Sequence, residues 1–133
     1  MRALNEYVVD THALFWYLSK SSKLSRTALN VFRDGEEGNA KLVVPTIVLC
    51  ELYYLNGKLG LPLAFSATCN ALVSASQFEI VDLGLADVLD LDALAGVPEM
   101  HDRLIAAAAA RRHCPVITKD EAIVSSGAVP TIW

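Results

Sequence analysis

The sequence predicts an α/β protein with a three-layer α/β/α arrangement around a central, mainly parallel sheet. Short β-prone apolar runs recur along the chain without alternating polar positions, which is typical of strands buried on both faces. Helical segments separate these runs, and strands separated by helices favour parallel pairing. Of the 133 residues, 53% are hydrophobic and 20% are charged, enough for a substantial core. We therefore expect one domain spanning 1–133.

The strands are expected where β-prone residues cluster between turn signals. They cover Tyr7–Val9, Leu42–Val44, Phe78–Val81 and Val116–Thr118, with Thr131–Trp133 as a candidate edge strand.

The helices are expected between these strands, and several have recognisable ends. They cover His12–Leu18, Arg26–Arg33, Ile47–Asn56, Leu63–Ser76, Leu85–Leu91 and an alanine-rich segment from Asp102 to His113. Ser25 and Thr46 are placed to cap the second and third helices, and Asp102 opens the last one. Gly57 is placed to end the third helix, and Asp34–Asn39 is expected to form a polar turn.

Composition excludes several classes of protein. The residues Met1–Glu6 contain no signal-peptide hydrophobic region, and the uncharged stretch Leu59–Phe78 is broken by Gly60 and Pro62. Its polar side chains would be costly in lipid, so we expect a half-buried helix and no membrane span. The odd number of cysteines, at Cys50, Cys69 and Cys114, suggests small core residues in a reducing cytoplasm.

The net charge of −4 argues weakly against nucleic-acid binding when it is taken alone. Acidic residues gathered around divalent cations would carry a less negative local field. The charge balance therefore leaves nucleic-acid binding open.

Three aspartates lie where ligands collect in parallel sheets, beyond the carboxyl ends of strands. Asp10 ends the first strand, Asp120 follows the Val116–Thr118 strand, and Asp102 begins a helix. Taken singly, each aspartate is better explained as a helix cap than as a ligand.

Glu51 is harder to explain by local structure. It is the only charge between Lys41 and Lys58, in a helix that is apolar nearly all round, so we expect most faces of that helix to be buried. A buried carboxylate needs a hydrogen bond from a tyrosine, a salt bridge to an arginine, or a metal ion. Metal coordination is the alternative that also explains the three aspartates.

A cluster of carboxylates without a histidine–cysteine pattern indicates Mg²⁺ or Mn²⁺ and not zinc. Such ions suit phosphodiester hydrolysis, because they activate water and neutralise the scissile phosphate.

Four segments resemble the motifs of PIN domains in VapC toxins, the ribonuclease halves of VapBC type II toxin–antitoxin systems. They are Val8–Trp16, Pro45–Leu55, His101–Ala109 and Cys114–Asp120, in the order of the family, with 41, 51 and 18 positions between successive acids. The segment Val97–His101 differs from the sequence that usually precedes the third acid in this family. All four acids are nevertheless present.

The resemblance implies a PIN-like fold and an acidic catalytic tetrad of Asp10, Glu51, Asp102 and Asp120. Asp10 and Asp102 would be the metal ligands. The resemblance also implies Mg²⁺-dependent endonucleolytic cleavage of RNA, homodimerisation, and inhibition by a small VapB-like antitoxin. We expect the uncharged helix near 63–76 to lie in the dimer contact.

Secondary roles remain open for residues beside the acids. Thr11 and Thr118 could orient metal-bound water or a carboxylate, or simply make local turn hydrogen bonds. Lys119 could contact phosphate or lie on a solvated face. Trp16 and Tyr17 are candidates for the antitoxin groove by family analogy.

Two other functions fit parts of the pattern. A non-catalytic PIN-like binding protein would retain the fold without cleaving RNA. A receiver-type phosphoacceptor module also has parallel strands and strand-end acids, but it should carry an acidic doublet where Asp10 is followed by Thr11 and His12.

Overall fold

The sheet is parallel throughout the part of the chain that the structure describes. The computed structural model describes residues 4–133, so Met1–Ala3, expected ahead of the first strand, lie outside it. The strand order is β3-β2-β1-β4-β5, and each neighbouring pair is parallel. The strands are β1 (Asn5–Val9), β2 (Ala40–Pro45), β3 (Phe78–Val81), β4 (Val116–Ile117) and β5 (Thr131–Ile132). The predicted parallel sheet is confirmed.

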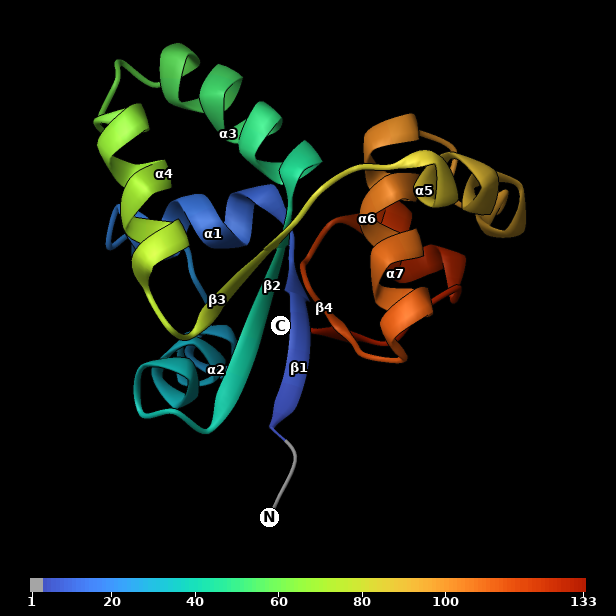
Figure 1. Ribbon diagram of the computed structural model, residues 1–133, viewed down its shortest axis with the longest axis horizontal. Helices are drawn as coiled ribbons and strands as arrows, with labels where there is room; N and C mark the ends of the chain where they lie inside the picture. The colour runs from blue at the N-terminus through green and yellow to red at the C-terminus, as the bar shows by residue number, and fades with distance from the viewer. Residues whose placement is uncertain (1–3) are drawn as a thin grey trace.

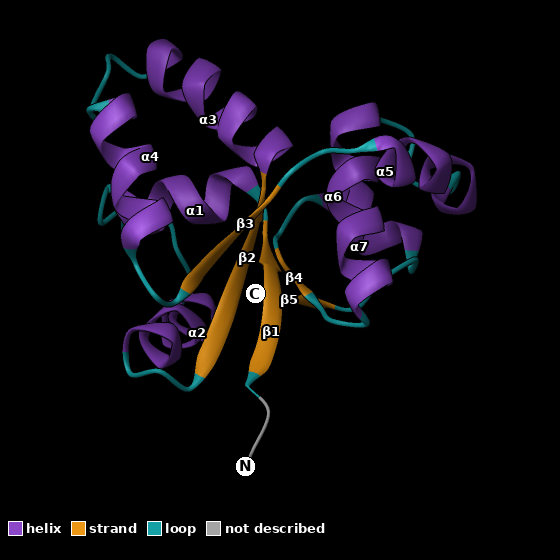
Figure 2. Cartoon of the chain, in the orientation of Figure 1, coloured by secondary structure: helices purple, strands orange, loops and turns teal. Residues whose placement is uncertain are grey.

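Helices cover both faces of this sheet, which confirms the three-layer α/β/α architecture. Helices α1 to α4 lie on one side and α5 to α7 on the other (Figure 1), and Figure 2 shows the strands between the two helical layers. The helices are α1 (Thr11–Leu18), α2 (Arg26–Glu36), α3 (Thr46–Lys58), α4 (Phe65–Ser74), α5 (Leu85–Leu89), α6 (Met100–Arg112) and α7 (Glu121–Ser126), with a 3₁₀ turn, η1, at Asp90–Leu94.

The core lies on both faces of the central strands. Successive residues Val8 and Val9 are fully buried, as are Leu42, Val43 and Val44, so neither face of β1 or β2 meets solvent. Helix α6 buries a continuous run from 104 to 109, four of whose residues are alanine. Small side chains let this helix pack close to β1 and hold its first turn near the ends of the strands.

Helix α2 is longer than the sequence predicts, because the expected polar turn from Asp34 begins as helix. Gly35 is buried in this last turn, and a Cβ there would stand 3.1 Å from Leu42 Cδ1. A glycine thus lets the helix continue against β2. Ser25 caps α2 as predicted, its hydroxyl accepting from the Ala28 N–H at 3.1 Å.

Both predicted signals at the ends of α3 are wrong. Thr46 is inside the helix, and its hydroxyl accepts from the Leu83 N–H at 3.0 Å, joining α3 to the segment after β3. The helix passes Gly57 and reaches Lys58, while Gly60 takes the positive φ of 82°. The Asn56 side chain is bonded to both backbone groups of Leu63, which fastens the α3–α4 connection beyond the helix end.

Only one cysteine behaves as a core residue. Cys114 is buried, whereas Cys69 is half-buried and Cys50 is exposed, so the expectation of three core cysteines is wrong for Cys50. Helix α4 fully buries only Leu72. Across residues 4–133, no helix combines the length and the apolar character needed to cross a membrane.

Candidate active site

The register of β1 and β4 brings the first acid beside a threonine hydroxyl. Val9 pairs with Ile117, so Asp10 and Thr118 are the residues that directly follow these two adjacent strands. The Thr118 hydroxyl donates to Asp10 Oδ2 at 2.5 Å, and the Thr11 N–H donates to Oδ1 at 2.7 Å. Asp10 is 6% exposed and occupies the N-cap position of α1. Two hydrogen bonds therefore fix the orientation of its carboxylate.

The same hydroxyl also positions the fourth acid. Thr118 Oγ1 accepts from the backbone N–H of Asp120 at 2.9 Å. The Asp120 carboxylate in turn accepts from the Ala122 N–H at 2.9 Å, which caps α7. Helix α7 was absent from the sequence prediction, and its short length gave little periodic pattern to detect.

Glu51 reaches this edge of the sheet from α3. Its Oε1 accepts from the Thr11 hydroxyl at 2.7 Å, and His101 Nδ1 lies 3.7 Å from Oε2. The partners are thus a threonine and a histidine, and not the tyrosine or arginine considered from the sequence. The side chain is 28% exposed. Helix α3 buries only Val48, Leu52 and Asn56, so the expectation that most of its faces are buried is wrong.

Asp102 lies in the first turn of α6. The prediction that Asp102 opens this helix is therefore wrong. Glu99 occupies the N-cap position, and its Oε2 accepts from the Asp102 N–H at 2.9 Å. The Glu99 carboxylate also lies 2.9 Å from His101 Nδ1. Sequence reasoning missed Glu99 because aspartate is the preferred capping residue, although three positions separate Glu99 from Asp102, as capping geometry requires.

The structure brings all four predicted acids to one pocket. Asp10, Glu51, Asp102 and Asp120 line a cavity of about 370 Å³ beyond the ends of β1 and β4. Its other lining residues are Thr11, His12, Tyr54, Leu55, Lys58 and His101. Four acids that are far apart in the sequence therefore share one site, at the sheet edge that the strand-end positions of Asp10 and Asp120 predict.

Burial, together with neighbouring charges, raises the pKa of three of the four acids. Burial raises the pKa of Asp102 to about 7, helped by Asp120, Asp10, Glu99 and Glu51. Burial also raises the pKa of Asp10, against the opposing hydrogen bonds from Thr118 and Thr11. The pKa of Glu51 rises through burial and, further, through the charge of Asp10, although the Thr11 hydroxyl opposes the rise. The pocket thus concentrates negative charge, which a cation would relieve.

The donor set of this pocket fits a hard divalent cation. Its four predicted acids offer only carboxylate oxygens, the ligands that Mg²⁺ and Mn²⁺ prefer. Within residues 4–133, no three acidic, histidine or cysteine side chains stand close enough to enclose a metal as they are. Mg²⁺ keeps several waters and uses one or two carboxylates, so it does not need such a closed cage.

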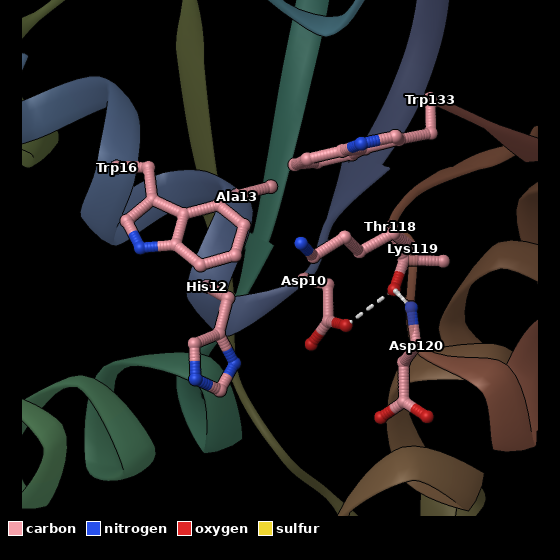
Figure 3. A pocket seen from close by; sticks show the side chains of 8 residues that line it. All are labelled: Asp10, His12, Ala13, Trp16, Thr118, Lys119, Asp120 and Trp133. Carbon is pink, nitrogen blue, oxygen red and sulfur yellow. Dashed lines mark hydrogen bonds between the residues drawn. The ribbon is translucent and has the colours of Figure 1, made fainter. Parts of the chain in front are cut away.

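A second pocket adjoins the acids on the side of α1. It measures about 420 Å³ and shares Asp10, His12 and Asp120 with the first pocket. Its other lining residues are Trp16, Lys119 and Trp133, together with Ala13 and Thr118 (Figure 3). From the sequence, Trp133 is expected only on an edge strand, and no motif connects it with the acids.

Together these features define an α/β protein with an acidic site at the carboxyl edge of a parallel sheet. The family model described as the PIN domain matches residues 7–126. The chain therefore belongs to the PIN-domain family.

Solved structures with the same fold include three toxin–antitoxin complexes. VapBC2 from Rickettsia felis, bound to a DNA fragment from its promoter, has 17% identity and a TM-score of 0.68, covering 95% of this chain and 96% of that one. DNA-bound VapBC from Salmonella typhimurium has 18% identity and a TM-score of 0.67, with 97% of each chain covered. A toxin–antitoxin complex from Klebsiella pneumoniae has 18% identity and a TM-score of 0.64, with 92% and 94% covered. At these identities the likeness is one of fold. No curated protein matches the sequence.

Proposed function

We propose that this protein is a Mg²⁺-dependent endoribonuclease and the toxin of a type II toxin–antitoxin pair, acting in the cytoplasm. The observation that carries the proposal is the convergence of Asp10, Glu51, Asp102 and Asp120 on one pocket. Membership of the PIN-domain family supports a nuclease, and the toxin–antitoxin complexes among the similar structures support the biological role.

In this proposal Asp10 and Asp102 hold the ion, and Glu51 and Asp120 complete the pocket. When bound, Mg²⁺ supplies an activated water and neutralises charge on the scissile phosphate. The chain's own part is to orient the ligands: Thr118 and the Thr11 N–H fix Asp10, and the Thr11 hydroxyl fixes Glu51. Asp102 must give up the proton that its raised pKa favours before it can bind metal.

The central test is metal-dependent cleavage of structured RNA. We expect cleavage with Mg²⁺ and with Mn²⁺, loss of cleavage in excess EDTA, and recovery when Mg²⁺ is restored, because oxygen ligands accept either ion. Gel analysis of an end-labelled RNA measures all three. Cleavage that persists undiminished in EDTA would reject the metal mechanism. A folded protein that binds RNA but never cleaves it would favour the non-catalytic alternative.

The receiver-type alternative does not agree with the topology. Phosphoacceptor modules of that fold have the strand order 2-1-3-4-5, whereas β1 here lies between β2 and β4. Glu51 also lies within α3, not at the end of a strand.

We further propose that a small VapB-like antitoxin binds beside the site. A cleft of about 560 Å³ between α1 and α2 is lined by apolar and charged groups, among them Trp16, Tyr17, Leu29 and Arg33. Trp16 and Tyr17, the candidates by family analogy, would contact the antitoxin in this cleft.

The homodimer is proposed from the exposed surface of α3, α4 and the connection between them. Val73, Tyr54 and Leu61 are each at least two-thirds exposed, and apolar surface of this kind often marks association sites. We expect a dimeric mass by light scattering at micromolar concentrations, and a shift toward monomer for Val73→Glu. A monomeric wild-type mass throughout that range would contradict the proposal.

A further inference from the structure

Two tryptophans and a lysine stand directly beside the acidic pocket. The rings of Trp16 and Trp133 are 5.7 Å apart between centroids and inclined at 62°. The ammonium of Lys119 lies 4.8 Å from the Trp16 ring centroid and 5.8 Å from that of Trp133. In Figure 3 the Lys119 ammonium lies between the two indole rings, and Asp10 and Asp120 lie below this group.

The fold places this group by the same register that places the acids. Ile117 pairs with Ile132, so Thr118 and Trp133, which directly follow β4 and β5, lie next to each other along the chain direction. Lys119 follows Thr118 and precedes Asp120. Trp16 is one helical turn after His12 on α1, and the two rings are 5.4 Å apart between centroids. Three elements thus bring the two indole rings and the Lys119 ammonium to the edge of the acidic site.

These side chains are better suited to binding a nucleotide than to a purely structural role. Both indoles are half-buried, while Lys119 is exposed, so the rings are anchored in the fold and border open space. Indole faces stack on nucleobases, and an ammonium contacts phosphate. A structural cation–π contact alone would leave unexplained why the group lines a cavity of about 420 Å³ that continues into the carboxylates.

We propose that Trp16 and Trp133 form a stacking subsite for an unpaired nucleobase next to the scissile phosphate, with Lys119 contacting the RNA backbone. This inference rests on the proposed ribonuclease function and names its substrate class. A base within a duplex has its faces covered by its neighbours, whereas bases in loops and single strands are free to stack on aromatic side chains. The subsite therefore selects RNA that is single-stranded at the position of cleavage.

The two tryptophans are the only ones in the sequence, so intrinsic fluorescence reports directly on the subsite. The test uses the full chain carrying Asp102→Asn, which slows cleavage, with Mg²⁺ and a short single-stranded RNA. We expect saturable quenching by this RNA and much weaker quenching by the same sequence in a duplex. An RNA with an abasic position at the stacked base should bind roughly 5- to 150-fold more weakly, the range for loss of one stacked base.

Matched variants in the same background separate stacking from general effects. Binding of a labelled RNA, measured by anisotropy, should weaken by a similar factor for Trp133→Ala and much less for Trp133→Phe. Leu85→Ala, which removes a 73% exposed side chain from α5, should leave the affinity unchanged. Thermal melts of each variant check folding, and Trp133→Phe keeps the test valid if Trp133→Ala unfolds.

Three results would overturn the proposal. They are equal affinity for the intact and the abasic RNA, equal affinity of Trp133→Ala and Leu85→Ala, and quenching by an arginine-containing peptide without quenching by RNA. The last would assign the pocket to a protein partner. The proposed ribonuclease function is tested separately. It fails if wild-type protein with Mg²⁺ cleaves no RNA, even when the abasic RNA and Trp133→Ala weaken binding as expected.

Discussion

Asp102→Asn is expected to reduce RNA cleavage roughly 100- to 1000-fold while the chain remains folded, and Asp10→Asn should do the same. Loss of a metal ligand removes several kcal/mol of charge stabilisation at the phosphate, which corresponds to that range in rate. Single-turnover cleavage with saturating Mg²⁺ measures the loss, and thermal melts report on folding. Asp34→Asn on α2, which changes an exposed aspartate outside both pockets, is the matched control.

The same Asp102 variant should change how stability depends on pH. The pKa of Asp102 is raised to about 7 in the folded chain, from roughly 3.9 in the unfolded chain. The folded state therefore binds more protons between these values, and the metal-free protein loses stability as pH rises from about 4 to 7. Asp102→Asn should lose less stability over that interval. If Asp102→Asn keeps full activity and the same dependence of stability on pH as wild type, Asp102 is not part of the site.

Glu51→Gln is expected to weaken cleavage and the stabilisation by Mg²⁺ without destabilising the metal-free protein. Burial and the charge of Asp10 raise the pKa of Glu51, so its contribution to stability is complete below about 4.3 and is lost as pH rises through the folded value. Glutamine does not ionise, so the variant does not lose this stability as pH rises. Metal binds the folded state preferentially and should reverse the loss in wild type more than in the variant.

Melts of wild type and Glu51→Gln, each with EDTA and with Mg²⁺ at several pH values, provide the measurement. Glu37→Gln at the exposed end of α2 is the control, because it removes a glutamate charge away from the pocket. If Glu51 instead serves mainly as an ion-pair partner of His101, which lies 3.7 Å away, its loss should destabilise the protein with or without metal. A large destabilisation in EDTA would therefore contradict the metal role.

The strands and the four acids could be predicted because their signals are local. A buried parallel strand is a continuous apolar run, and an acid directly after it points to the carboxyl edge of the sheet. Asp10 and Asp120 were found in this way. The sequence also identified Glu51 correctly as a charge in an apolar helix, although α3 exposes Tyr53 and Tyr54 to solvent and is not buried on most faces.

The features that escaped prediction depend on contacts between distant residues. Thr46 has the right type for a cap, but its hydroxyl bonds to Leu83 across the fold. Helix α2 continues past Asp34 because Gly35 packs against Leu42 of the adjacent strand. Trp133 becomes part of the site only through the pairing of β5 with β4. No spacing within one segment reveals such partners.

The position of β1 at the centre of the sheet has a consequence for the order of events during synthesis. β1 is made first, yet one of its neighbours, β4, lies more than 100 residues later in the chain. Domains generally begin to fold as the chain emerges, and distant pairings form slowly. Until β4 emerges, Asp10 lacks the Thr118 hydroxyl that orients it. The nascent chain therefore carries Asp10, Glu51 and Asp102 before the hydrogen bond that orients Asp10 can form, and the pocket is complete only after β4 has paired with β1.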